Sequence, residues 1–200
     1  MIVSVAIMPG TIHLLRHGTH AEVGKRLSGR SEIALDERGR AEAAALAPAL
    51  DSLPIASIHS SPRRRALETA APLAERRGFP VHIAPALDEI DFGIFTGRDF
   101  VELDADSDWM RWNAERPRFR CPGGETMAEA VERAWSYLSA LPAEAMPALC
   151  VTHCDVIRGV VAARLGLDGI FALGCDPASL TSLAIEGDGV RLLTLNARLP

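Results

Sequence analysis

An arginine and a histidine stand directly before a glycine in residues 14–18 (LLRHG), at the end of the short apolar run 12–15. The run predicts a strand that delivers both side chains into a glycine turn, where α/β proteins usually present ligand-binding groups. A neutral imidazole can attack a phosphoryl group when a neighbouring arginine neutralises the oxygens that it approaches. Alone, this tripeptide is equally compatible with two ordinary surface residues, so the rest of the chain decides.

Two further basic residues could serve the same chemistry. A transferred phosphoryl group needs cationic and N–H donors for its oxygens while charge redistributes. Arg65 follows residues 60–62 (SSP) near the start of an expected helix, and His153 ends an expected strand directly before another helix. Because parallel strands place their carboxyl ends at one edge of a sheet, we expect these groups to converge with the arginine and histidine of residues 14–18.

An acid must also protonate the leaving oxygen and later accept a proton from water. Carboxylates of this kind stand in residues 87–93 (LDEIDFG), in an expected loop. Residue type alone leaves Asp88, Glu89 and Asp91 as equal candidates for the acid.

Strand-like and helix-like segments alternate along most of the chain, which predicts an α/β fold with three α/β/α layers and a mostly parallel central sheet. The expected strands span residues 12–15, 55–59, 81–84, 149–152, 179–186 and 189–195, the last two joined as a hairpin. The first expected helix begins after a cap at Asp36. The second begins with a serine cap followed by Pro62 and ends at Gly78. Three more are expected near residues 99–114, 126–141 and 156–165. We expect residues 1–200 to form one domain, with residues 1–10 a disordered extension or one assigned from the wrong start codon.

The composition excludes several classes of protein. Hydrophobic residues make up 48% of the 200 residues and charged residues 24%, a globular balance. The net charge of −5 argues against nucleic acid as the partner, and no apolar run is long enough to span a membrane. The four cysteines lack the spacing of a metal site, so we expect free thiols, a cytoplasmic protein and no metal ion.

Together these motifs resemble the histidine phosphatase superfamily, also called the phosphoglycerate mutase-like family. The matching stretches follow the family's order over about residues 12–158. They are residues 14–18 (LLRHG), 60–70 (SSPRRRALETA), 87–93 (LDEIDFG), 122–125 (PGGE) and 151–153 (VTH).

The resemblance implies a role for each of these groups. His17 would carry the phosphoryl group in a covalent intermediate, and Glu89 would be the general acid and base. The expected catalytic and phosphate-binding set is completed by Arg16, Arg65, His153 and Cys154. In residues 63–65 (RRR) the family's arginine is the one directly before Ala66, which leaves Arg63 and Arg64 as solvated helix residues. No cofactor is implied.

The chain departs from the family pattern at two places. Many members have an asparagine phosphate ligand where Val23 stands, and valine cannot donate a hydrogen bond. The candidates for contacts with phosphate or substrate near this position are His20, Lys25, Ser28 and Gly29. Residues 154–155 (CD) replace glycines that often follow the second histidine, and we expect Asp155 to cap the following helix.

The most probable activity by this resemblance is hydrolysis of a small phosphomonoester, as in the phosphatase branch with α-ribazole phosphatase-like members. Phosphoglycerate mutases share the machinery but carry longer insertions around the pocket. A cofactor-dependent mutase and a non-catalytic module that binds a phosphorylated ligand are the alternatives. Residues 19–30 and 94–122, where the family match is weakest, are expected to determine the substrate.

Overall fold

A six-stranded sheet forms the centre of the computed structural model, which describes residues 10–187 and 189–199. The strands are β1 (Thr11–Arg16), β2 (Ser57–Ser60), β3 (Val81–Ile83), β4 (Ala148–Thr152), β5 (Leu180–Glu186) and β6 (Gly189–Ala197). Their spatial order is β3-β2-β4-β1-β5-β6. The first four in this order are parallel, whereas β5 runs antiparallel to β1 and β6 runs antiparallel to β5. The expected mostly parallel sheet is therefore confirmed.

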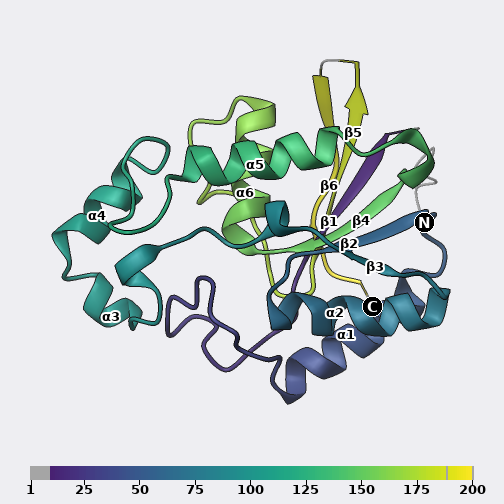
Figure 1. Cartoon of the computed structure of the whole chain (residues 1–200), viewed down its shortest axis with the longest axis horizontal. Coiled ribbons are helices and arrows are strands. Elements are labelled where there is room, and N and C mark those ends of the chain that lie inside the picture. The colour runs from purple at the N-terminus through teal and green to yellow at the C-terminus, as the bar shows by residue number, and fades with distance from the viewer. Residues whose placement is uncertain (1–9, 188, 200) are drawn as a thin grey trace.

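Helices cover both faces of this sheet, so the fold has the three expected layers. The helices are α1 (Glu37–Ala49), α2 (Arg64–Arg77), α3 (Phe100–Leu103), α4 (Ser107–Ala114), α5 (Met127–Ser139) and α6 (Cys154–Leu165). Helices α1 and α2 lie on one side of the sheet and α5 and α6 on the other, while α3 and α4 lie beyond its end (Figure 1). Short 3-10 turns occupy Pro85–Leu87, Gly93–Phe95 and Ala143–Ala145.

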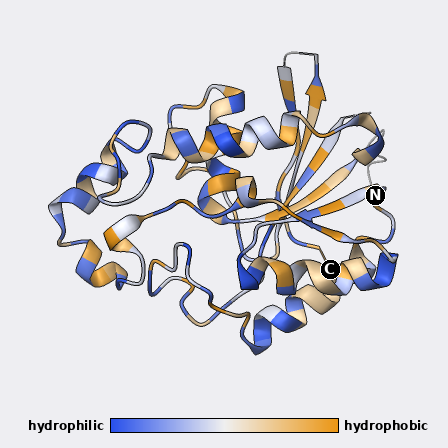
Figure 2. Ribbon diagram, in the orientation of Figure 1, coloured by the Kyte–Doolittle hydropathy of each residue, from blue (hydrophilic) through white to orange (hydrophobic). Residues whose placement is uncertain are grey.

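Two apolar clusters hold the layers together, one on each face of the sheet. Successive strand residues point to opposite faces, so Leu14 packs into the cluster under α5 and α6 and Leu15 packs into the cluster under α1 and α2. Leu14 and Leu15 are each only 1% exposed. Figure 2 shows hydrophobic colours along the strands, while the helices are banded in hydrophobic and hydrophilic colours. Burial of both faces fixes the register of β1 and therefore where it ends.

Local signals set several helix ends as expected. The Asp36 side chain accepts a hydrogen bond of 2.8 Å from the backbone N–H of Gly39, which caps α1. Gly78 ends α2 in the left-handed region at φ 67°, a conformation that glycine adopts without steric cost. Thr126 and Glu129 form a reciprocal capping box at the start of α5.

Other expected helix ends were wrong. Helix α2 begins at Arg64 with Arg63 at its N-cap, so neither the serine cap nor Pro62 as the first helical residue is correct. The expected helix at 99–114 is two helices, because Asp106 caps a new start at Ser107. Helix α6 begins at Cys154, two residues before the expected start.

The turn after β1 is held by a close approach to α1. A Cβ atom added to Gly18 would lie 2.9 Å from the Gly39 carbonyl oxygen, and one added to Gly39 would lie 1.9 Å from the Thr19 carbonyl oxygen. Both positions therefore require glycine, because backbone approaches backbone. The Gly18 N–H donates to Thr69 Oγ1 on α2, and Glu42 on α1 accepts from Thr19. The turn that carries His17 is thus fixed from two helices.

The remaining expectations concern the termini and the cysteines. Of residues 1–10, only Gly10 lies within the described part of the chain, and a single domain over residues 1–200 stays a prediction. All four cysteines are free, as expected. Among residues 10–187 and 189–199, no helix combines the length and apolarity needed to cross a membrane.

Candidate active site

His17 lies directly after β1, 3% exposed, with one ring nitrogen fixed by the backbone. Its Nδ1 lies 2.8 Å from the Gly18 carbonyl oxygen, which can only accept, so Nδ1 carries the proton. Its Nε2 accepts a hydrogen bond of 3.2 Å from Arg65 Nε. Burial, followed by the charges of Arg65 and Arg16, holds the pKa of His17 well below its usual range. The ring is therefore neutral, with the Nε2 lone pair facing the arginine.

Arg65 links the two histidines of the site. It belongs to the first turn of α2 and is 1% exposed, and among the described residues none of its hydrogen bonds goes to a carboxylate. Its Nη2 lies 3.1 Å from His153 Nδ1 and donates to the Gly29 carbonyl oxygen at 2.7 Å, while its Nη1 donates to the Ser31 carbonyl oxygen. A buried guanidinium whose charge is unpaired favours an anion beside it.

His153 ends β4 and forms the N-cap position of α6. It is fully buried, and its ring centroid lies 5.2 Å from that of His17. The Nε2 atom lies 2.7 Å from Ser61 Oγ, whose hydroxyl in turn donates to Asp88 at 3.4 Å. Because the Ser61 hydroxyl donates its proton to the hydrogen bond with Asp88, it can only accept from His153. Nε2 of His153 therefore carries the ring proton, and Nδ1 accepts from Arg65. Ser61 Oγ also accepts from the Arg63 N–H at 3.3 Å, although α2 begins only at Arg64.

Of the three loop carboxylates that residue type left equal, only Glu89 lines the cavity next to His17. Its Oε1 accepts from the Ile90 N–H at 2.9 Å, and its Oε2 lies 3.9 Å from His153 Nδ1. Burial, followed by the negative charge of Asp155, raises the pKa of Glu89 to about 8. A carboxylic acid that keeps its proton near neutral pH can act as a general acid.

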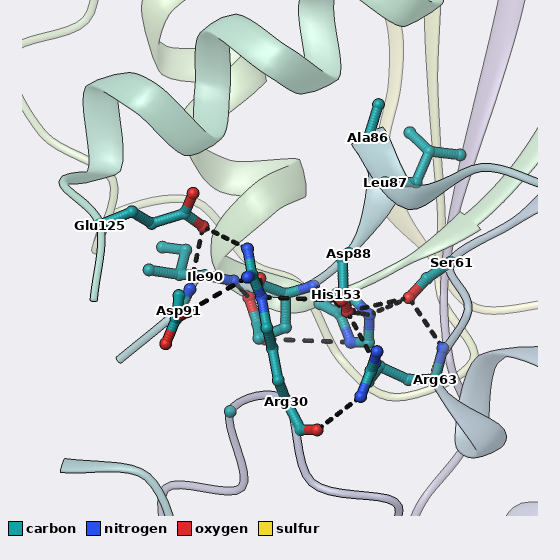
Figure 3. A network of polar contacts seen from close by, with 12 residues as sticks. Arg30, Ser61, Arg63, Ala86, Leu87, Asp88, Ile90, Asp91, Glu125 and His153 are labelled. Carbon is teal, nitrogen blue, oxygen red and sulfur yellow. Dashed lines mark hydrogen bonds and ion pairs between the residues drawn. The ribbon is translucent and has the colours of Figure 1, made fainter. Parts of the chain in front are cut away.

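A polar network fixes the segment that carries Glu89 (Figure 3). The backbone carbonyl oxygen of Glu89 accepts from Arg30 Nε at 2.9 Å and from Arg133 Nη2 at 3.0 Å. Glu125 Oε1 contacts both of these arginines, at 3.0 and 2.7 Å. Glu125 and Arg133, which stand before and within α5, thus hold the backbone of Glu89 in place.

Asp88 and Arg63 form a second part of this network. Asp88 accepts from the Glu89 N–H at 2.8 Å and pairs with Arg63 Nε at 3.0 Å (Figure 3). Arg63 also donates to the Arg30 carbonyl oxygen at 2.7 Å. The expectation of a solvated Arg63 was wrong, since the side chain helps to place Asp88; Arg64, by contrast, pairs with Glu68 on the helix surface.

Arg16 and Cys154 complete the expected phosphate-binding set. Arg16 ends β1, and its Nη1 donates to the Cys175 carbonyl oxygen at 2.6 Å. Cys154 is the first residue of α6, where unpaired backbone N–H groups favour an anion. Of the six residues expected to handle the phosphoryl group, all but His153 line one cavity of about 420 Å³. His153 lies behind Arg65 and contacts the guanidinium of that residue.

The residues expected near the replaced asparagine separate into two groups. His20, Ser28 and Gly29 line the cavity, as does Val23 itself. Lys25 does not: its side chain is exposed, and the neighbouring Arg26 lines the cavity instead. Ser28 Oγ donates to Glu22 at 2.7 Å.

Among these residues, His20 packs directly beside His17. It is 5% exposed, and its ring centroid lies 5.2 Å from that of His17. Its buried Nδ1 atom finds no hydrogen-bond partner among the described residues. Burial, followed by the charge of Arg65, lowers the pKa of His20 to about 4, so the ring is neutral. A buried unpaired nitrogen in this wall is available to a ligand.

Asp155 is placed differently from the expectation. It lies in the first turn of α6 without capping it, because His153 is at the N-cap. Its Oδ2 instead accepts from Arg116 Nη1 at 2.8 Å. Arg116 is 7% exposed and lies 4.6 Å from the ring centroid of Phe171. The paired arginine offsets the carboxylate charge that stands close to the phosphoryl-binding groups.

Several cavity residues were not predicted individually. Arg116 lies in residues 94–122, which were expected to determine the substrate, but nothing in that stretch marked this arginine. Arg158 comes from α6, and Phe171 and Cys175 come from the segment after it; neither position carried a motif. Arg158 stands four residues after Cys154, so both lie on the same face of α6. This spacing is the signal that could have indicated Arg158.

Comparison with known proteins agrees with the motifs. Residues 12–198 match the family described as the histidine phosphatase superfamily, branch 1. A glucosyl-3-phosphoglycerate phosphatase of Mycolicibacterium vanbaalenii is 32% identical over 166 residues, 77% of this chain and 73% of the relative. A probable phosphoglycerate mutase of Cronobacter sakazakii is 33% identical over 162 residues, covering 78% and 75%. The α-ribazole phosphatase structure from Shigella flexneri superposes with a TM-score of 0.82 at 25% identity, covering 94% of this chain and 97% of that one. The chain belongs to the histidine phosphatase superfamily, branch 1.

Proposed function

We propose that this protein is a phosphatase that hydrolyses a small phosphomonoester through a phosphohistidine on His17. The observation that carries the proposal is that one cavity holds a neutral imidazole and a protonated carboxylic acid. His17 is neutral, with an unprotonated Nε2 that attacks once it gives up its hydrogen bond from Arg65, and Glu89 keeps its proton near neutral pH. A nucleophile and an acid in these states are what the first half of the reaction requires.

In the first step, His17 Nε2 attacks phosphorus while the bond from phosphorus to the ester oxygen breaks. Glu89 gives its proton to that oxygen, and the alcohol leaves. In the second step, a water molecule attacks the phosphohistidine and passes a proton to the Glu89 carboxylate. The bond from phosphorus to Nε2 breaks, inorganic phosphate leaves, and both residues return to their starting states.

The oxygens of the transferred group are stabilised by fixed cationic groups. Arg16 and Arg65 are held by backbone carbonyl oxygens, and the N-terminus of α6 adds the N–H of Cys154. His153 offers an unprotonated Nδ1 to Arg65 before the substrate binds. A phosphoryl dianion beside it raises the pKa of His153, so we propose that Nδ1 takes up a proton and then donates to a phosphoryl oxygen.

We also propose that the enzyme works in the cytoplasm, without a metal ion and without nucleic acid as a partner. Four free cysteines fit a reducing compartment. The arginines supply the positive charge that a metal ion provides in other phosphoryl-transfer sites.

The test of this function is release of inorganic phosphate from a panel of monoesters with a chelator present throughout. The panel includes glucosyl-3-phosphoglycerate, 3-phosphoglycerate, phosphoserine and α-ribazole phosphate. We expect release from at least one of them, unchanged by EDTA. Inhibition by EDTA would contradict a metal-free reaction. Isomerisation of 3-phosphoglycerate primed with 2,3-bisphosphoglycerate, without net hydrolysis, would identify a mutase, and binding without either reaction would identify a ligand-binding module.

The dependence of kcat/KM on pH tests the protonation states. The active form has Glu89 protonated, and its pKa of about 8 places the loss of activity on the alkaline side. The pKa of His17 lies well below 6.5, so mild acid does not protonate the nucleophile. We therefore expect a plateau from mildly acidic to neutral pH and a fall as pH rises through about 8. A monotonic increase up to alkaline pH would exclude Glu89 as the acid.

A further inference from the structure

Two cysteines that are far apart in the sequence meet in the wall of the active-site cavity. Cys154 is the first residue of α6, and Cys175 lies in the segment between α6 and β5. The Cys154 thiol donates to the Cys175 carbonyl oxygen at 3.7 Å. Both residues line the cavity, Cys154 half-buried and Cys175 4% exposed. Small solutes that enter the cavity can therefore reach this pair.

The surroundings favour a reactive thiolate at one of the two positions. The hydrogen bond from Cys175 and the charge of Arg16 lower the pKa of Cys154. The position at a helix N-terminus acts in the same direction. Burial in the core raises the pKa of Cys121 to about 12 and also raises that of Cys150, which makes these two thiols inert. Thiolate character and access thus coincide only at Cys154 among the four.

We propose that Cys154 and Cys175 are a redox modification site, at which hydrogen peroxide converts two thiols into one disulfide. The Cys154 thiolate attacks a peroxide oxygen, the O–O bond breaks, and a sulfenic acid and hydroxide form. The Cys175 thiol then attacks the sulfur of that sulfenic acid, and water leaves as the S–S bond forms. Two thiols are oxidised, one peroxide is reduced to two water molecules, and a thiol reductant reverses the change.

The disulfide would change the geometry beside the phosphoryl-binding groups. Arg16 is held by the carbonyl oxygen of Cys175, and the backbone N–H of Cys154 belongs to the helix N-terminus that faces the anion. The thiol that now contacts the Cys175 carbonyl oxygen must instead bond the Cys175 sulfur at about 2.05 Å, which shifts the two backbone segments relative to each other. Displacement of catalytic groups by about 1 Å can cost up to about 10²-fold in rate. This effect on rate rests on the proposed function, whereas the disulfide itself does not.

The direct test is peptide mapping of the wild-type protein after peroxide treatment, without reduction. Trypsin places Cys154 in the peptide 134–158 and Cys175 in the peptide 165–191. We expect these two peptides to be joined, with the loss of two hydrogen atoms per chain, and to separate after treatment with dithiothreitol. Peptides that stay separate, or a join to the Cys121 peptide, would overturn the proposal. The measurement needs no variant and no enzyme activity.

Variants then identify which cysteines are involved. Cys150 shares the tryptic peptide of Cys154, so Cys150→Ala is the matched control and is expected to keep the cross-link. Cys175→Ser is expected to lose the cross-link, and its Cys154 then oxidises to a sulfinic acid that dithiothreitol does not reverse. Loss of the link in Cys150→Ala, with retention in Cys175→Ser, would assign the disulfide to another pair.

Phosphate release measured on the same samples tests the effect on activity, each protein being compared with its own reduced state. We expect the oxidised wild type to lose at least about 10-fold in kcat/KM and to recover on reduction. A mapped disulfide with an unchanged rate would overturn the effect on the site. If the reduced protein hydrolyses no monoester, the proposed function fails while a mapped disulfide still supports the modification site.

Discussion

Replacement of His17 by alanine is expected to lower phosphate release by about 10⁴-fold or more and to abolish the acid-labile phosphate label on the protein. The expected loss is this large because no other group can replace the nucleophile. His20 and His153 are the nearest imidazoles, each with its ring centroid 5.2 Å from that of His17. His153 is occupied by Ser61 and Arg65, and His20 lies on the cavity wall. Rapid-quench labelling with a 32P-labelled substrate measures the intermediate directly.

His82→Ala is the matched control for this substitution. His82 is exposed on β3 and stacks on His59, outside the residues that line the cavity. We expect this variant to keep both turnover and the acid-labile label. Turnover that survives in His17→Ala, or a label that persists there, would show that the phosphohistidine forms elsewhere or not at all.

Replacement of Glu89 by glutamine is expected to lower kcat by about 10²- to 10⁴-fold and to remove the fall in rate at alkaline pH. Glutamine keeps the shape of the side chain but cannot transfer a proton. The loss should be largest for alkyl phosphates and smaller for an aryl phosphate whose phenol leaves without protonation. A uniform loss across leaving groups would contradict a general acid. An unchanged kcat would assign the acid to Asp88 or Asp91.

The stability of the same variant distinguishes a catalytic defect from a folding defect. The pKa of Glu89 is raised from 4.5 to about 8, so unfolding releases a proton between these values and the wild type loses stability there as pH rises. Glutamine cannot ionise, so Glu89→Gln should unfold at a higher Tm than the wild type at pH values near 8. Thermal denaturation across this range provides the comparison. Asp91→Asn, which alters a carboxylate outside the cavity lining, should keep the alkaline fall in rate.

Local signals in the sequence predicted those parts of the fold that depend on neighbouring residues. Asp36 caps α1 because its own backbone places the carboxylate beside the Gly39 N–H, and Gly78 ends α2 because glycine alone adopts its backbone angle freely. The short apolar run 12–15 predicted the strand β1, which the structure shows to be buried on both faces. Ser61 does not cap α2, and its hydroxyl contacts His153 and Asp88, which belong to segments distant in sequence. Tertiary contacts of that kind leave no mark on the residues next to Ser61.

The candidate site also has a part that the sequence predicted and a part that it did not. Motifs in the family's order predicted the residues that handle the phosphoryl group, since that chemistry restricts the side chains that can serve it. The structure then removed an ambiguity that residue type could not, because Asp88 pairs with Arg63 and only Glu89 lines the cavity. The distal wall was not predicted: Arg116 and Phe171 meet only after two loops fold together, and each is an ordinary surface residue by its local sequence.

The direction of β5 bears on how this site can be altered. Since β5 is antiparallel to β1, the segment leading into it arrives at the edge of the sheet where the parallel strands end. Residues 166–179 thus build a wall of the cavity with Phe171 and Cys175, while His17 and His153 stand on other strands. Cys175, Ala178 and Ser179 hydrogen-bond Arg16 or His17, so this end of the segment is tied to the reacting groups. The part around Phe171 can change in length or polarity while those groups keep their positions. The fold thereby separates choice of substrate from the transfer of phosphate.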